Sequence, residues 1–240
     1  MMNAKRIQRE LKQPFSANDL EWRVQASGKA GDRIWCRVIA YVTNRAIQTR
    51  LDSVFGIFGW QNEYKPSPNM AGTICGISVN VDGKWVTKWD GAEDTAIEST
   101  KGGLSGSMKR AAVQWGIGRY LYDVDAEYAP VITVDDFKKL QRNEKDEYKK
   151  AKTKEDEYFY WKPPVLPERF QPKKHVTPSI VKKIEELAEK TDTDVKSICD
   201  NYGVDEIVDL YGDEAGEAIA LLLRKQKAED EHGTDETNKS

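Results

Sequence analysis

The sequence of 240 residues is 39% hydrophobic and 32% charged, so it is long enough for one sizeable domain and a smaller one, and apolar enough to bury a core. No run approaches the roughly 18 apolar residues of a transmembrane helix, and the polar N-terminus has no signal-peptide core. We therefore expect a cytoplasmic protein without membrane contact. Three scattered cysteines, Cys36, Cys75 and Cys199, are typical of buried thiols rather than of a disulfide framework or a zinc site.

The net charge of −3 is unevenly distributed. Residues 1–130 contain 17 basic and 14 acidic side chains, residues 131–178 contain 12 and 9, and residues 179–240 contain 8 and 17. A mildly basic body with an acidic C-terminal region indicates a polyanion-binding part joined to a part with a different role.

The N-terminal part of the chain is predicted to mix helices and strands. Apolar residues four positions apart predict a short helix over 4–11. Alternating β-branched and aromatic residues predict a strand over 33–42. An apolar stripe over Ile47–Phe58 predicts a second helix, which Gly56 and Gly59 end.

A β-hairpin is expected next. Residues 60–65 read as a strand, and residues 73–81 and 84–89 alternate about Asp82-Gly83, a pair that favours a two-residue turn. The alternation places one set of apolar side chains on a single face of this hairpin: Cys75, Ile77, Val79 and Val81.

A long helix over 95–122 holds the most informative residues. Its predicted core stripe consists of Leu104, Met108, Ala111, Ala112 and Trp115. At about 100° per residue, Lys109 and Arg110 then lie on the face turned away from the core.

The C-terminal part changes in composition. We expect a core over 1–142, an extended Lys-, Glu- and Pro-rich linker over 143–177, a helical module over 178–227 and a disordered acidic tail over 228–240. The helices expected in the module cover residues 178–190, 192–202, 204–211 and 213–227.

Two candidate sites for catalysis are weak. The segment Lys101–Ser107 is rich in glycine but lacks the order of a phosphate-binding loop, so no ATP is expected. Four acidic residues between the hairpin and the long helix are potential metal ligands: Asp90, Glu93, Asp94 and Glu98. Acidic residues are also common at helix N-termini, and no second cluster or histidine accompanies these four. We therefore expect no catalytic residue, no metal and no cofactor.

The basic residues fit either a groove for nucleic acid or an ordinary solvated surface, and composition does not decide between the two. Lys109 and Arg110 are accompanied by other basic residues of the same half, namely Arg37, Arg45, Arg50, Lys101 and Arg119. Trp35, Trp60 and Trp85 are available to stack on bases, although most tryptophans are buried in cores.

Two stretches of sequence, with the hairpin between them, resemble the Rad-fifty-two superfamily of single-strand annealing proteins, especially its phage-encoded Sak-type members. The first is RLDSVFGIFGW over 50–60, which resembles the family's "N-x-x-F-G-x-x-G-W" turn. The second is GSMKRAAVQWGIGRYLY over 106–122, which resembles the family's "LKRAxxxFGxGRYLY" signature. The resemblance covers about residues 5–128.

This resemblance implies an α+β fold with a curved antiparallel sheet packed on a long helix, and a small all-helical C-terminal module beyond it. It implies a homo-oligomeric ring or helical filament that binds single-stranded DNA and the annealed duplex intermediate in phage homologous recombination and repair. It also implies annealing without ATP or metal. If the protein is phage-encoded, its location is the cytoplasm of a bacterial host.

Carried over by position, the family's DNA-binding residues fall on Lys109 and Arg110, and a basic position ahead of that helix falls on Lys101. An arginine of the family is replaced by Ala46, so Arg45 and Arg50 become candidates for that contact, and Arg119 lies in the signature itself. A further basic position of the family is occupied by Val113.

The helical module at 178–227 is too acidic to be the main DNA site, and we expect it to bind a protein such as the host single-strand-binding protein. A stabilising appendage or a regulator that competes with DNA is the alternative. For the whole chain, the alternatives to an annealing protein are a metal-dependent nuclease that uses the Asp90–Glu98 carboxylates, and a non-catalytic recombination adaptor.

Overall fold

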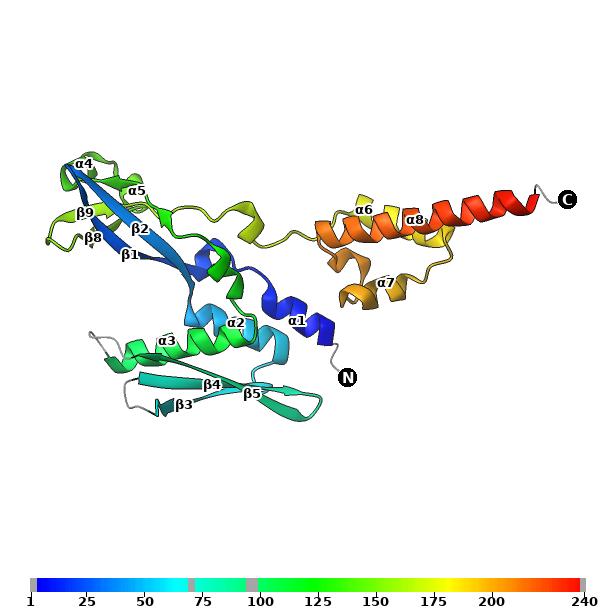
Figure 1. Cartoon of the computed structure of the whole chain (residues 1–240), viewed down its shortest axis with the longest axis horizontal. Coiled ribbons are helices and arrows are strands. Elements are labelled where there is room, and N and C mark those ends of the chain that lie inside the picture. Colours follow the sequence, from blue (N-terminus) through cyan, green and yellow to red (C-terminus); the bar gives the residue numbers. More distant parts are fainter. Residues whose placement is uncertain (1–3, 69–71, 94–98, 238–240) are drawn as a thin grey trace. The chain divides into compact units, whose positions relative to one another are not determined.

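The computed structural model describes residues 4–68, 72–93 and 99–237 (Figure 1). The chain divides into two compact units. The core unit consists of residues Leu11–Pro172, and the terminal unit combines residues Met1–Glu10 with Lys173–Ser240. Within the described ranges, no helix is long and apolar enough to cross a bilayer.

Over its described residues, the core unit contains three antiparallel three-stranded sheets. The first sheet has the order β1 (Leu20–Ala30), β2 (Arg33–Val42), β6 (Glu127–Tyr128). The second has the order β3 (Trp60–Pro66), β4 (Gly72–Val81), β5 (Lys84–Glu93). The third has the order β7 (Val131–Ile132), β9 (Tyr158–Trp161), β8 (Lys149–Lys152).

The helices that belong wholly to the core unit are α2 (Asn44–Phe55), α3 (Ser99–Gln114), α4 (Val134–Lys139) and α5 (Arg142–Lys145). Three 3-10 turns cover Ala17–Asp19, Arg119–Asp123 and Glu168–Phe170. Antiparallel sheets with a long helix packed on one of them, and helices at the C-terminus, confirm the predicted α+β class.

Helix α3 packs on the second sheet, against β4 and β5 (Figure 1). The predicted faces meet here, because Cys75, Ile77 and Val79 on β4 and Met108 and Ala111 on α3 are all almost completely buried. The turn at Asp82-Gly83 has φ angles of 50° and 83°, which confirms the predicted two-residue hairpin turn. Burial raises the pKa of the Cys75 thiol to about 11, so this cysteine acts as a core residue.

Helix α2 is shorter than the apolar stripe predicts. It ends at Phe55, where Gly56 adopts a φ of 74° and its N–H donates to the Asp52 carbonyl. Phe58 therefore lies beyond the helix and its side chain is 90% exposed, so its expected place in the core is wrong. Glycine adopts this positive φ without strain, so Gly56 can end the helix before Phe58.

Strand β1 has no counterpart among the predicted elements. Its pairing with β2 shifts register between Val24 and Ala26, which breaks the alternation of side chains. The strand nevertheless contributes Trp22 to a buried cluster with Cys36 and Val38 of β2. Burial of apolar surface, rather than the local pattern, thus determines this strand.

The region 143–177, expected to be an extended linker, instead contributes regular structure and buried side chains to the core unit as far as residue 170. It contains α5, β8 and β9, and Phe159 and Trp161 from β9 are buried against the first sheet. Side chains of a strand alternate between faces, so the run Tyr158–Trp161 sends two aromatic rings into the core. The Lys- and Glu-rich composition around it conceals this signal.

The terminal unit is helical. It contains α6 (Pro178–Lys190), α7 (Val195–Tyr202), the 3-10 turn Ile207–Asp209 and α8 (Gly212–Thr237), together with residues 4–10 of α1 (Ala4–Lys12). Gly203 ends α7 with a φ of 70°, the cap predicted from the sequence. Helix α8 extends to Thr237, well beyond the predicted end at residue 227. The core of the terminal unit includes Ile184, Leu187, Leu210 and Leu222.

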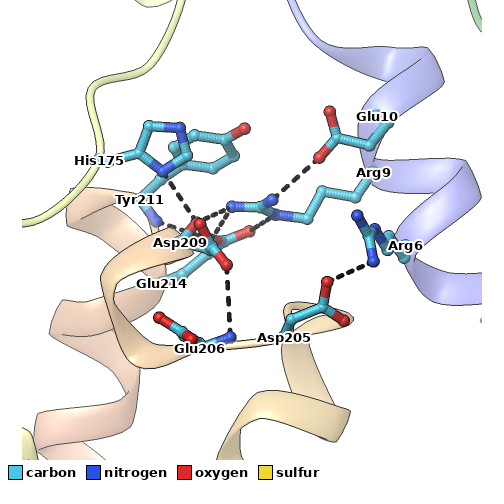
Figure 2. Close-up of polar contacts among 9 residues, drawn as sticks. All are labelled: Arg6, Arg9, Glu10, His175, Asp205, Glu206, Asp209, Tyr211 and Glu214. Atoms are coloured by element: carbon cyan, nitrogen blue, oxygen red, sulfur yellow. Dashed lines mark hydrogen bonds and ion pairs between the residues drawn. The ribbon is translucent and has the colours of Figure 1, made fainter. Parts of the chain in front are cut away.

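One buried arginine joins α1 to the rest of the terminal unit (Figure 2). The Arg9 guanidinium donates from Nε and Nη2 to the two carboxylate oxygens of Glu214, each at 3.1 Å. It also donates to the Asp209 carbonyl and lies 3.8 Å from the centroid of the Tyr211 ring. The Arg9 side chain is only 10% exposed, so these contacts replace water almost completely.

We expect Arg9→Ala to destabilise the terminal unit by about 2 kcal/mol, because it leaves the largely buried Glu214 carboxylate without its cation. The measurement is native-state hydrogen exchange of the α6 and α8 amides. Tryptophan fluorescence does not follow this unit, because all seven tryptophans lie between residues 22 and 161.

Arg6→Ala is the matched control. Arg6 lies on α1, one turn before Arg9, and forms an ion pair with Asp205. Both side chains of this pair are exposed, so removing the Arg6 side chain should change the stability by less than about 1 kcal/mol. Equal protection of the amides in the two variants would contradict the role assigned to Arg9.

Candidate nucleic-acid interface

A groove of about 610 Å³ lies between β2 and α3 of the core unit. Its lining is mostly apolar, and its polar or aromatic side chains are those of Gln25, Tyr41, Lys109, Arg110, Tyr122 and Asp125. Two of them, Lys109 and Arg110, are basic residues predicted to contact DNA. The helix that buries Met108 and Ala111 thus turns the intervening residues toward the groove.

Lys109 is the electrostatically distinctive residue of the groove. Its side chain is half-buried, with Nζ 5.7 Å from the centroid of the Tyr41 ring. Burial, and then the nearby Arg23 guanidinium, lower the pKa of Lys109, while Glu21 opposes them. Among the described residues Lys109 forms no direct ion pair, and Glu21 compensates its charge only in part, so an entering anion would further stabilise the charged lysine.

Arg110 is oriented by an acidic residue on β5. Its Nε donates to Asp90 Oδ1 at 3.1 Å, and Gln114 Nε2 donates to Asp90 Oδ2 at 2.9 Å. Burial raises the pKa of Asp90, but the hydrogen bonds from Gln114, the Gly91 amide and Arg110 together bring it below its ordinary value. Arg110 itself remains exposed, so part of its guanidinium is available to a second anion.

These hydrogen bonds to Asp90 also bear on whether the acidic residues between the hairpin and the long helix could bind a metal ion. Asp90 is already engaged by three hydrogen-bond donors, and Glu93 is exposed at the end of β5. Asp94 and Glu98 lie outside the described residues. In the part of the chain that is described, no group of three histidine, cysteine or acidic side chains is placed to hold a metal ion.

Two aromatic residues of the groove were not predicted as site residues. Tyr41 is on the β2 face opposite to the buried Val38, and Tyr122 is 71% exposed in the 3-10 turn after α3. Gly118 brings that turn against β2, since its φ is 67° and an added Cβ would lie 3.2 Å from Val42. The alternation of side chains along the strand 33–42 already places Tyr41 on the face opposite to Val38, and this was the sequence signal for Tyr41.

Of the other predicted site residues, Arg45, Arg50 and Arg119 do not line the groove. Arg50 donates to the Gln13 carbonyl at 2.9 Å and lies over the Phe15 ring, so its described contacts are structural. Arg45 is exposed on α2. Lys101 belongs to α3, but its side chain is outside the described part of the structure.

The Arg119 side chain caps the C-terminus of helix α3, which ends at Gln114. Its Nε and Nη2 donate to the Val113 carbonyl at 2.9 and 2.6 Å, and Nη2 also reaches the Gln114 carbonyl at 3.1 Å. The carbonyls at a helix C-terminus have no partners within the helix and carry a partial negative charge. The geometry therefore gives Arg119 a structural task in addition to the DNA contact predicted for it.

Comparison with known proteins assigns the family. Residues 3–140 match the model of the "Rad52/22 family double-strand break repair protein", which is more than half of the chain, and the protein belongs to this family. It is 32% identical over 130 residues to the single-stranded DNA-binding protein DdrA of Deinococcus radiodurans. It is 31% identical over 128 residues to DdrA of Deinococcus deserti.

Each of these matches covers 51% of the chain and only 58% or 59% of the relative. No solved structure matches the chain. The groove, α3 and the first two sheets all lie within the region that matches the family, whereas β8, β9 and most of the terminal unit lie outside it.

We expect Arg119→Ala to lower the free energy of unfolding of the core unit by about 1 kcal/mol, because it removes charge-assisted bonds to two helix-terminal carbonyls. Urea unfolding followed by tryptophan fluorescence measures this, since Trp115 adjoins the helix end. Arg45→Ala, at an exposed site, is the control and should be neutral. Identical midpoints for the two variants would contradict the capping role.

Proposed function

We propose that the protein binds single-stranded DNA in the groove between β2 and α3 and anneals complementary strands in homologous recombination and repair. It does so without ATP, metal or a catalytic residue. The observation that carries the proposal is the half-buried Lys109, which forms no direct ion pair with the described residues and lies beside Arg110 in one groove. The DdrA relatives are single-stranded DNA-binding proteins by name, which supports the same ligand for the shared region.

The arrangement suits a phosphate backbone better than it suits base-specific contacts. Lys109 and Arg110 are adjacent on a rigid helix, so they present two cations at a constant spacing. Contacts to phosphates position a nucleic acid without reading its sequence. Annealing requires this, because the base edges must stay free to meet a complementary strand.

Aromatic side chains supply the second component of single-strand recognition. Tyr41 and Tyr122 line the groove with exposed rings, on which bases of any identity can stack. Double-stranded DNA keeps its bases stacked on one another and gains nothing from such rings. The groove therefore favours single strands.

We also propose that the protein works as a homo-oligomeric ring or filament, in which the grooves of successive copies form a continuous basic track. The open face of the second sheet supports this, because Trp85 and Trp89 on β5 are exposed there. Light scattering of the full chain tests it, and a monomer at all concentrations would contradict it.

The double variant Lys109→Ala/Arg110→Ala should bind a labelled oligo-dT at least tenfold more weakly, because two phosphate contacts are lost. The slope of log K against log salt should become shallower by about 1.4, since each single-strand contact contributes about 0.7. Fluorescence anisotropy at several salt concentrations measures both quantities.

Lys182→Ala/Lys183→Ala is the matched control. It also removes two adjacent, exposed lysines from a helix, but this helix is α6 of the terminal unit. It should leave the affinity within about twofold of wild type and the salt slope unchanged. An equal loss in both variants would mean that net charge, rather than the groove, determines binding.

Annealing itself is tested with two complementary labelled oligonucleotides in the presence of EDTA and without ATP. Wild-type protein should accelerate pairing, and the groove variant should not. Binding without acceleration would favour a recombination adaptor. Magnesium-dependent loss of the substrate that Asp90→Ala abolishes would favour the nuclease alternative.

We propose further that residues 178–227 bind a protein partner, such as the host single-strand-binding protein. Their acidity disfavours a direct DNA role, and they belong to a unit with its own core. Purified single-strand-binding protein should bind the full chain but not a chain that ends at Pro172. Equal binding by both would contradict the assignment.

A further inference from the structure

The third sheet carries an exposed lysine and tyrosine cluster that no family resemblance covers, because β8 and β9 lie beyond residues 3–140. We propose that its outer face is a second contact for single-stranded DNA, at which a base stacks on Tyr158 and a phosphate binds Lys150. This proposal rests on the proposed function, since it assumes the same ligand, but it concerns a separate surface.

The register of the hairpin determines which side chains share this face. Lys150 pairs with Tyr160 and Lys152 with Tyr158, so these four residues point to one side. The residues between them point to the other side, where Phe159 and Trp161 are buried. The buried rings hold the hairpin on the core unit and thereby fix the outer face.

Helix α4 covers only one end of the outer face. The Phe137 ring stacks on Tyr160 at 3.5 Å between centroids, with an angle of 3° between the planes. Tyr158 lies two residues further along β9 and remains 45% exposed. One tyrosine of the face is therefore used in packing, and the other is open to a ligand.

Two lysines flank the open tyrosine. Lys150 Nζ lies 4.0 Å and Lys152 Nζ 4.7 Å from the centroid of the Tyr158 ring. Lys152 is paired with Asp156 at 2.8 Å, whereas Lys150 forms no ion pair with the described residues. An exposed cation–π contact is weak, so an incoming strand can replace the contact between Lys150 and Tyr158. A phosphate of the strand would then bind Lys150, and a base would stack on the Tyr158 ring.

Two of the three acidic residues of the adjacent turn are engaged by lysines, and the third is Glu155, next to Lys154 in the chain. Asp156 is neutralised by Lys152, and Glu157 forms an ion pair with Lys29 of β1 at 2.6 Å. The Ser27 hydroxyl on β1 also donates to the Lys152 carbonyl at 3.2 Å. These contacts attach the hairpin to β1, so the second contact and the groove belong to the same compact unit.

The test uses the full-length protein and a fluorescein-labelled oligo-dT. Tyr158→Ala should weaken binding about five- to tenfold, because a base loses its stacking partner, whereas Tyr158→Phe should keep wild-type affinity. Lys150→Ala should make the salt slope shallower by about 0.7. Tyr128→Ala is the control, since Tyr128 is an exposed tyrosine on β6 of the same unit. Urea unfolding of each variant confirms that the fold is retained.

The outcomes separate this proposal from the proposed function. If Tyr158→Ala binds as wild type while Lys109→Ala/Arg110→Ala does not, the second contact is wrong and the groove stands. If Tyr158→Ala weakens binding and the groove variant does not, the second contact stands and the groove fails. A Tyr158→Ala variant with unchanged affinity but altered oligomeric mass would overturn the proposal and make this face an interface between copies.

Discussion

The burial of helix α3 against the second sheet is the constraint on which the site depends. Met108, Ala111 and Ala112 must face β4 and β5 to complete the core, and this fixes the rotation of the helix about its axis. Lys109 and Arg110 then have no freedom to turn elsewhere, because a helix advances 100° per residue. The same apolar contacts that stabilise the core unit therefore position its two cations in the groove.

The buried and half-buried cations of the two units differ in how far acidic side chains compensate them. In the groove, Arg110 is held by Asp90, whereas Lys109 forms no direct ion pair with the described residues and Glu21 compensates its charge only in part, so a bound anion would offset the cost of burying it. In the terminal unit, Arg9 is fully satisfied by Glu214 and its neighbours, and nothing remains for a ligand. A half-buried cation without a partner distinguishes a binding site from a structural ion pair.

The sequence predicts the elements with strong periodicity and misses those determined by tertiary packing. The hairpin turn at Asp82-Gly83, the core face of α3 and the position of Lys109 and Arg110 away from that face follow from spacing, whereas their role in DNA binding comes from the family resemblance. Strand β1 is missed because its bulge interrupts the alternation, and strand β9 because charged residues surround its aromatic run. Whether an arginine faces a ligand or caps a helix, as Arg119 does, depends on contacts that no local pattern encodes.

The most direct test of the account is acetylation of lysine side chains, followed by mass spectrometry, with and without saturating oligo-dT. Lys84, exposed at the β4–β5 turn, serves as the reference in the same molecule. Bound DNA should slow the modification of Lys109 at least severalfold and leave that of Lys84 unchanged. Equal modification of Lys109 in the free and DNA-bound protein would contradict the placement of DNA in the groove.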